Sequence, residues 1–261
     1  DPKNAKSGDD FRHASRYIYL VAGIASLLLS AISLKLPHTP PKPPAQAGEK
    51  LAWLEAIKLL RKPFVLVLFC VTLIDAAVHQ TFFYWTERFL TSDVKIAANC
   101  GSPVMKIGQI AEIITMICLG YVLKSLGWRW TMIIGILGHA GRFAVFAFYP
   151  EPWAAISINA IHGICYAFFF ATVYIFIDEF FPKDARASAQ ALFNFLILGI
   201  GPFLANFACG KLGEHYALGH DAKGAANRWD FKEIFLYPLA AALIGAILLL
   251  LFFRPPEKKQ D

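Results

Sequence analysis

Polar and ionisable residues that could do chemistry recur at helical spacings within otherwise apolar stretches. Asp75 and His79 are four residues apart, so their carboxylate and imidazole can share a helix face and a proton. Gln109 and Glu112 are three residues apart and can also share a face. Further polar residues of this kind are Gln80, His139, Arg142, Asn159, His162, Tyr166, Asn194 and Asn206. Together these side chains are suited to hydrogen-bonding a polar ligand and to carrying a proton.

Long apolar runs must position these residues. The chain is 57% hydrophobic and only 17% charged, which is too apolar for an ordinary soluble domain. A run of about 18 residues is long enough to cross a hydrocarbon core about 30 Å thick as a helix. The sequence predicts seven such helices, at 17–34, 64–85, 107–126, 130–149, 153–177, 189–210 and 234–253.

The predicted fold class is therefore an all-α membrane protein with seven transmembrane helices. Helices satisfy every backbone polar group within one segment, which hydrocarbon requires. The sequence lacks the alternating pattern of about ten residues that marks an outer-membrane barrel. Very apolar core helices of a soluble protein are the other alternative, but the runs leave almost no polar faces.

The segments between the runs indicate the organisation of the chain. We expect a polar extracytoplasmic loop at 1–16, a first span at 17–34, and a Pro-rich cytoplasmic linker with an amphipathic interfacial helix at 35–62. A plain tether is the alternative for that linker. A six-helix bundle at 63–254 and a cytoplasmic tail at 255–261 follow. The polar start without an initiator Met favours a piece of a longer protein, whose own N-terminal bundle would be the partner of this one.

Basic residues favour one orientation. With the 35–62 linker placed in the cytoplasm and residues 1–16 left out of the count, the cytoplasmic side has 13 Lys and Arg residues and the other side has seven. We therefore interpret the net charge of +6 as topology and contact with membrane lipids, and expect no nucleic-acid partner. The expected location is a cell (inner) membrane, as a multi-pass protein.

Four stretches carry a family resemblance. They are residues 105–112 (Met-Lys-Ile-Gly-Gln-Ile-Ala-Glu), 123–128 (Leu-Lys-Ser-Leu-Gly-Trp), 162–166 (His-Gly-Ile-Cys-Tyr) and 186–192 (Arg-Ala-Ser-Ala-Gln-Ala-Leu). They resemble the nucleoside:proton symporter family of the major facilitator superfamily, over essentially the whole chain. The resemblance implies one helix of an N-terminal bundle followed by the six-helix C-terminal bundle, and a secondary active transporter that works by alternating access.

The resemblance also implies site residues. It assigns nucleoside binding to Gln80, Gln109, Glu112, His162 and Tyr166. The family pattern commonly has an acid after the tyrosine and an amide three residues after the first glutamine. This chain has Ala167 and Phe83 at those positions. A different substrate, a different proton carrier, or no proton coupling are the interpretations left open.

Physical reasoning adds roles to these residues. An ionisable group at hydrocarbon depth costs on the order of 3 kcal/mol or more, so it should face a cavity or a partner. Asn194 joins the substrate-binding candidates as a hydrogen-bonding amide. The proton-coupling candidates are Glu112, Arg142, His162, Asp75 and His79, with Glu112 expected near Arg142 and His162. Structural hydrogen bonds between helices are the alternative role for each of these polar residues.

Other functional classes remain as alternatives. A membrane hydrolase would need a nucleophile and base or a set of metal ligands, and no such motif occurs in the sequence. We therefore expect no enzymatic activity, cofactor or metal. A sugar-type symporter of the same superfamily, or a membrane sensor or scaffold that does not transport, is also compatible with the sequence.

Overall fold

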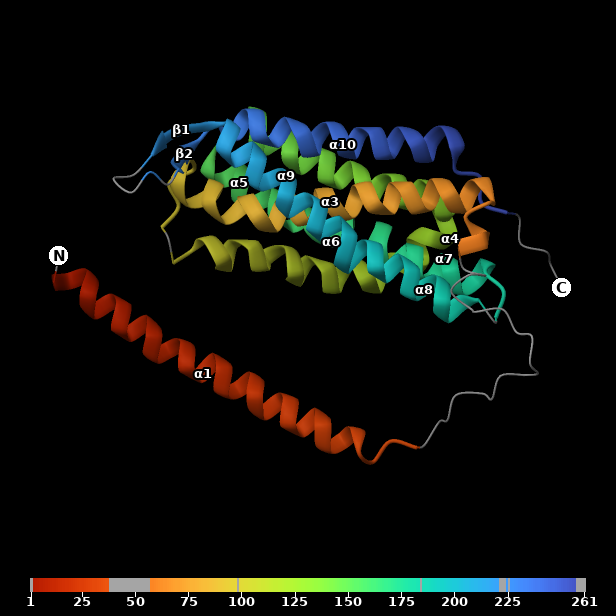
Figure 1. Cartoon of the computed structure of the whole chain (residues 1–261), viewed down its shortest axis with the longest axis horizontal. Coiled ribbons are helices and arrows are strands. Elements are labelled where there is room, and N and C mark those ends of the chain that lie inside the picture. The colour runs from red at the N-terminus through yellow and green to blue at the C-terminus, as the bar shows by residue number, and fades with distance from the viewer. Residues whose placement is uncertain are drawn as a thin grey trace. The chain divides into compact units, whose positions relative to one another are not determined.

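The computed structural model describes residues 2–37, 57–97, 99–183, 185–220, 224 and 226–256. The chain divides into two compact units, Asp1–Glu49 and Lys50–Asp261. Most of the predicted linker, its interfacial helix and the end of the tail lie outside the described residues. Figure 1 labels the elements of both units.

Helix α1 (Pro2–Ser33) is the only described element of the first unit. It includes most of the first predicted span, but residues expected to form a loop at 1–16 are helical from Pro2 onward. Proline fits the first turn of a helix, and no further proline follows before Ser33 to end it. Within the described residues, its apolar part covers Tyr19–Ser33, which is shorter than a typical membrane span.

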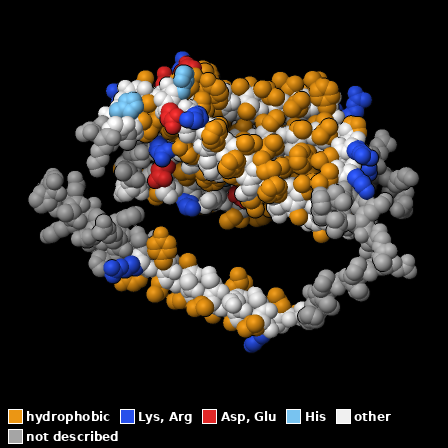
Figure 2. Space-filling view, in the orientation of Figure 1, with side chains coloured by type: hydrophobic (Ala, Val, Ile, Leu, Met, Phe, Trp, Pro, Cys, Tyr) orange, Lys and Arg blue, Asp and Glu red, His pale blue; other side chains and the backbone are white. Residues whose placement is uncertain are grey.

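The second unit contains five helices that are long and apolar enough to cross a membrane. They are α3 (Pro63–Ser92), α4 (Gly101–Phe148), the stretch Pro152–Phe180, the stretch Arg186–His215, and α10 (Phe231–Phe252). Hydrophobic side chains cover the middle of this unit and charged ones gather at its two ends (Figure 2). This distribution is the one expected for helices that pass through a bilayer.

Helix α4 folds back on itself at Gly127, which has a φ of 75° and a ψ of 172°. Gly108 and Gly138 would be about 45 Å apart in a straight helix. Yet a Cβ atom on Gly108 would lie 2.6 Å from the Cβ of His162, and one on Gly138 would lie 2.9 Å from the Sγ of Cys165. The first arm (101–126) and the second arm (128–148) therefore run in opposite directions (Figure 1).

Any side chain at position 127 is expected to strain the backbone. Gly127→Ala should destabilise the protein by about 1–3 kcal/mol, because this φ/ψ region is essentially restricted to glycine. Gly120→Ala is the matched control on the same element: nothing lies within 4 Å of its added Cβ, and alanine favours a helix. Thermal unfolding of the purified variants checks this. Equal melting temperatures for the two variants would contradict the role of Gly127 as the turning point.

Two of the long helices are irregular at their centres. Pro152–Phe180 consists of α5 (Pro152–Ser157), the 3₁₀ turn η1 (Ile158–Ile161), α6 (His162–Cys165), the π-helical η2 (Tyr166–Ala171) and α7 (Thr172–Phe180). Arg186–His215 consists of α8 (Arg186–Phe195), the π-helical η3 (Leu196–Ile200) and α9 (Gly201–His215). Such π segments often occur at functional sites, because they re-aim side chains within a helix.

The fold departs from an all-α protein at one place. Strands β1 (Ala217–His220) and β2 (Ala226–Trp229) pair antiparallel between α9 and α10. Gly224, with a φ of 79°, lies in the connection between them and supplies a conformation that other residues rarely adopt. Sequence analysis did not predict this hairpin, because its strands are short and mix polar with apolar residues.

An aromatic core joins α3, the second arm of α4 and α10. The rings of Phe89 and Phe146 have centroids 4.9 Å apart, and those of Phe89 and Phe235 are 5.0 Å apart. Phe143 lies 5.6 Å from Phe235 and is fully buried. This packing fixes the three helices side by side and so positions the polar residues that α3 and the second arm carry.

Candidate functional site

A buried charged network connects three membrane-spanning helices. Arg142, on the second arm of α4, places its Nη1 atom 3.0 Å from Nδ1 of His162 and its Nη2 atom 2.7 Å from Nδ1 of His139. The Nε2 atom of His139 lies 3.8 Å from Oδ1 of Asp75 on α3. Asp75, His139 and Arg142 are fully buried and His162 nearly so. We call these four residues the buried network.

Arg142 determines the tautomers of both histidines. A guanidinium group only donates hydrogen bonds, so Nδ1 of His139 and Nδ1 of His162 must both accept. Each neutral imidazole then carries its proton on Nε2. For His139 that N–H faces Asp75, so His139 links the buried carboxylate to the buried guanidinium.

This arrangement restricts where another proton can bind. Neither histidine can take a proton on Nδ1 while Arg142 donates to it. Within the described part of the chain, neither oxygen of Asp75 has a hydrogen-bond partner. Asp75 is therefore the member of the buried network whose lone pairs are available without first breaking a bond to Arg142.

Aromatic rings enclose the buried network. His79 stacks on His162 with ring centroids 5.0 Å apart and an interplanar angle of 23°. Phe82 also stacks on His162 at 5.0 Å, and the guanidinium carbon of Arg142 lies 3.8 Å from the centre of the Phe82 ring. Ring faces of this kind favour a cation, so Phe82 helps to hold Arg142 at this depth.

A second polar group lies on the first arm of α4. Gln109 is exposed and Glu112 is half-buried, and both line a cavity of about 670 Å³. Gly163 places α6 directly against the backbone of Glu112, since an added Cβ would lie 2.5 Å from its nitrogen. Three apolar side chains, Ile113, Met116 and Ile117, complete the lining of this cavity.

Two hydrogen bonds to asparagine side chains join further helices. Nε2 of Gln80 on α3 donates to Oδ1 of Asn206 on α9 over 3.1 Å. The hydroxyl of Tyr174 on α7 donates to Oδ1 of Asn194 on α8. Gln80 and Asn194 thus each have a partner in the structure.

The structure brings some of the sequence-predicted residues together and separates others. His162 and Arg142 are hydrogen-bonded, and Asp75 and His79 lie beside them, as expected of a shared site. Among the described residues, Glu112 forms no hydrogen bond or ion pair with Arg142 or His162. The ring of Tyr166 lies 6.0 Å from that of His79.

Sequence reasoning did not include His139 among the site residues. The signal was present, because His139 and Arg142 have the same i, i+3 spacing as Gln109 and Glu112. Asn206 and Tyr174 were missed as partners, because a hydrogen bond between distant helices leaves no trace in local spacing. In the described part of the chain, no three His, Cys, Asp or Glu side chains are grouped closely enough to hold a metal ion.

The long apolar helices and their buried ionisable residues define a multi-pass integral membrane protein with a polar network inside an otherwise apolar interior. The chain belongs to the nucleoside H⁺ symporter family, whose family model matches residues 7–258. That family consists of transporters rather than enzymes.

Individual relatives agree with this assignment. YegT of Escherichia coli (strain K12) is 27% identical over 247 residues, covering 92% of the chain and 57% of YegT. Xanthosine permease of the same organism is 26% identical over 263 residues, covering 94% of the chain and 60% of the permease. The nucleoside permease NupG of that organism is 27% identical over 223 residues, covering 80% of the chain and 53% of NupG. The chain therefore spans between 53% and 60% of the length of these relatives.

The fold is also similar to a solved structure. A crystal structure of a mutant of the nucleoside transporter NupG matches with a TM-score of 0.71 at 24% identity. The match covers 90% of this chain and 60% of that one. The helical membrane fold is thus shared with a transporter.

Proposed function

We propose that the protein is a secondary active transporter that moves a nucleoside together with protons by alternating access. The observation that carries the proposal is the buried network of Asp75, His139, Arg142 and His162, which crosses three spanning helices of a chain from the nucleoside H⁺ symporter family. Charges at this depth are costly and are retained where they serve a solute or proton pathway. The membrane is a cell (inner) membrane.

The proposed topology has seven spans. The turn at Gly127 lets each arm of α4 cross separately, so the second unit supplies six crossings. The seventh would be the span predicted at 17–34, most of which lies in α1. An N-terminal bundle of the same protein would face this unit across the solute cavity, as in transporters built from two six-helix halves. The solute would bind where the two halves meet.

On the substrate side, the proposed ligands of the nucleoside are Gln80, Gln109, Glu112, His162, Tyr166 and Asn194. Amide and carboxylate groups suit the hydroxyl groups of a ribose and the polar edge of a base. The cavity beside Gln109 and Glu112 would hold part of the solute. Gln80 and Asn194 would exchange their present bonds to Asn206 and Tyr174 for bonds to the ligand.

In proton coupling, Glu112 and the buried network have different roles. Glu112 borders a cavity and can exchange a proton with water as that cavity opens. Asp75 would hold a proton inside the helix bundle, where it faces His139, while His79 stacks on His162. A proton on Asp75 removes the counter-charge of Arg142 and leaves a buried cation without compensation. This imbalance would favour a rearranged state and so couple protonation to the change of access.

Replacement of the cavity carboxylate tests the proton coupling. Glu112→Gln is expected to abolish uptake driven by a pH gradient while leaving exchange of nucleoside across the membrane, because the amide binds the solute but carries no proton. Uptake of radiolabelled nucleoside into proteoliposomes, with and without the gradient, is the measurement. The control is Glu151→Gln, an exposed carboxyl at the start of α5. If uptake by Glu112→Gln depends on the pH gradient as strongly as uptake by the control variant, Glu112 does not carry the coupled proton.

The same assay separates the alternatives. Uptake of a sugar in place of nucleosides would identify a sugar-type symporter, and binding without movement of any solute would identify a sensor. A thermal-shift panel of nucleosides, nucleobases and sugars identifies the ligand class, because a ligand that binds the folded protein raises its melting temperature, and at equal concentration a tighter ligand raises it more.

A further inference from the structure

A second polar cavity lies at the hairpin end of the second unit, away from the buried network. It has a volume of about 540 Å³. Its walls come from the end of α3, from α9 and from the β-hairpin. We call it the hairpin pocket, and its main side chains are Tyr84, Trp85, Arg88, Glu214, His220 and Trp229.

The walls of the hairpin pocket combine flat aromatic faces with hydrogen-bonding groups. Trp85 and Trp229 have ring centroids 5.6 Å apart. The guanidinium carbon of Arg88 lies 5.0 Å from the ring centre of Tyr84 and 6.0 Å from that of Trp229. Aromatic faces beside an arginine bind planar heteroaromatic rings such as nucleobases, and stacking of this kind does not depend on which base is bound.

Glycine makes room for this arrangement. A Cβ atom on Gly213 would lie 2.9 Å from Cη2 of Trp85 and 3.6 Å from Nε1 of Trp229. A larger residue at this position of α9 would therefore push the Trp85 ring away, while its contact with Trp229 would be an ordinary one. Gly213 therefore allows both tryptophans to line the cavity with α9 packed against them.

The hairpin pocket lies on the same helix seam as the proposed central site. Gln80, Tyr84 and Arg88 follow one another at intervals of four residues on α3, so they form a stripe about 12 Å long. Asn206, Gly210 and Glu214 repeat that interval on α9. Gln80 and Asn206 are hydrogen-bonded, and the residues that follow on both helices line the hairpin pocket.

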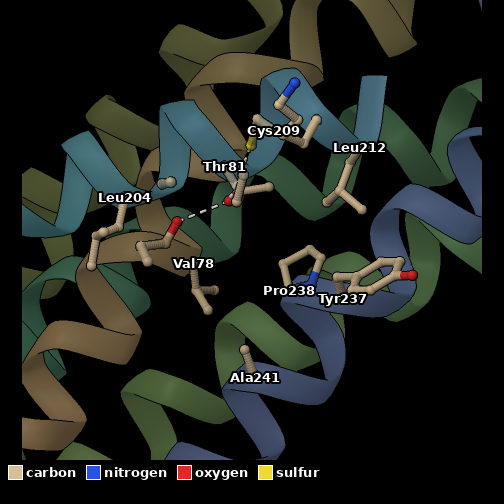
Figure 3. A pocket seen from close by; sticks show the side chains of 12 residues that line it. Val78, Thr81, Leu204, Cys209, Leu212, Tyr237, Pro238 and Ala241 are labelled. Carbon is tan, nitrogen blue, oxygen red and sulfur yellow. Dashed lines mark hydrogen bonds between the residues drawn. The ribbon is translucent and has the colours of Figure 1, made fainter. Parts of the chain in front are cut away.

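A neighbouring cavity between α3, α9 and α10 has different chemistry. It has a volume of about 460 Å³ and is lined mainly by alanine, leucine and other apolar side chains (Figure 3). The hydroxyl of Thr81 donates to the carbonyl of Ala77, and the thiol of Cys209 lies 3.6 Å from that hydroxyl. Its polar groups are thus directed at one another, and the hairpin pocket is the better site for a polar ring.

We propose that the hairpin pocket is a second binding site, which takes the planar base of a nucleoside before the solute moves along the α3–α9 seam to Gln80 and Asn206. This inference rests on the proposed function for the class of solute. The base stacks on Trp229 and Tyr84, and Arg88 and His220 bind its polar edge. Glu214, whose Oε2 accepts from Nζ of Lys211 over 2.9 Å, would add a bond to that edge. By the count of basic residues, the hairpin end is the extracytoplasmic side, from which a solute would enter.

Photolabelling with azidoadenosine tests the proposal. The full protein in proteoliposomes is labelled and its peptides are mapped. Label is expected both on hairpin peptides containing Tyr84–Arg88 or β2 and on central peptides containing Gln109 or His162. Excess free adenine should remove the hairpin label and excess ribose should not, because the site recognises the base.

Variants of the stacking residue make the test specific. Trp229→Ala should lower the hairpin label about 5- to 150-fold, the range expected for loss of one stacked ring. Trp229 also packs against Phe231, with ring centroids 6.2 Å apart, so its loss could disturb the fold of the hairpin. Trp229→Phe keeps an aromatic ring and should restore most of the label, which separates stacking from hairpin folding. Trp153→Ala is the control, an exposed tryptophan at the start of α5.

Each outcome decides between the two proposals. Label on the central peptides alone, or a hairpin label that survives in Trp229→Ala, would contradict the proposal that the hairpin pocket binds the base. The proposed function would still stand. No label on any peptide would overturn the proposed function, and the hairpin pocket with it. A hairpin label that ribose displaces and adenine does not would overturn recognition of the base.

Discussion

Arg142→Met is expected to destabilise the protein by about 3–5 kcal/mol and to abolish transport. The guanidinium donates to His139 and His162 and, through His139, offsets the charge of Asp75. Its removal leaves a buried carboxylate without a counter-charge and two imidazoles without a donor, and breaking a buried pair in this way has costs of this size. Thermal unfolding and initial uptake rates per folded molecule measure the two effects.

A double variant separates lost charge balance from lost packing. Asp75→Asn combined with Arg142→Met should regain much of the stability of Arg142→Met, because the uncompensated carboxylate is gone. It should not regain proton-driven uptake. Arg228→Met is the control, because this arginine is exposed on β2 and distant in sequence from the network. If Arg142→Met had the same melting temperature as the control variant, the buried network would contribute little to the stability of the protein.

The positions of the spans could be predicted from the sequence because hydrocarbon thickness sets a minimum apolar length. The runs predicted at 64–85, 153–177 and 189–210 each lie within one long helix of the structure. The runs predicted at 107–126 and 130–149 correspond to the two arms of α4. The sequence places Gly127 between them, although its conformation is visible only in the structure.

The partners of the polar residues could not be predicted in the same way. Spacing along one helix suggested that Asp75 pairs with His79, whereas Asp75 faces His139 on another helix and His79 stacks on His162. Helical spacing gives the residues that share a face but not the neighbour that this face meets. Likewise, sequence reasoning expected Glu112 near Arg142, but Arg142 donates to two histidines instead.

The close contact between the first arm of α4 and α6 carried a signal that sequence reasoning did not use. Gly108 directly precedes Gln109, and Gly163 directly follows His162. Small residues let membrane helices approach closely. A Cβ on Gly108 would lie 2.8 Å from the carbonyl oxygen of Asn159, and one on Gly163 would lie 2.5 Å from the backbone of the first arm. These glycines set how near the cavity residues come to the buried network.

Gly163→Ala is expected to reduce transport at least tenfold and to destabilise the protein by about 1–3 kcal/mol. The added Cβ would lie 2.5 Å from the carbonyl carbon of Ala111 and from the nitrogen of Glu112. These are backbone atoms, so the first arm of α4 must move away from α6 as a whole. Glu112 then moves relative to His162, and the proposed solute contacts on the two helices no longer fit one ligand.

A matched glycine isolates the effect of this contact. Gly141→Ala adds the same methyl group to the second arm of α4, where nothing lies within 4 Å. It should transport like the unaltered protein, because alanine in a helix costs nothing without a clash. Nucleoside KM and maximal rate, measured per folded molecule, distinguish a displaced site from a loss of protein. If Gly163→Ala matched Gly141→Ala in both, then the spacing between Glu112 and the buried network would not matter for transport, and the two groups would act independently.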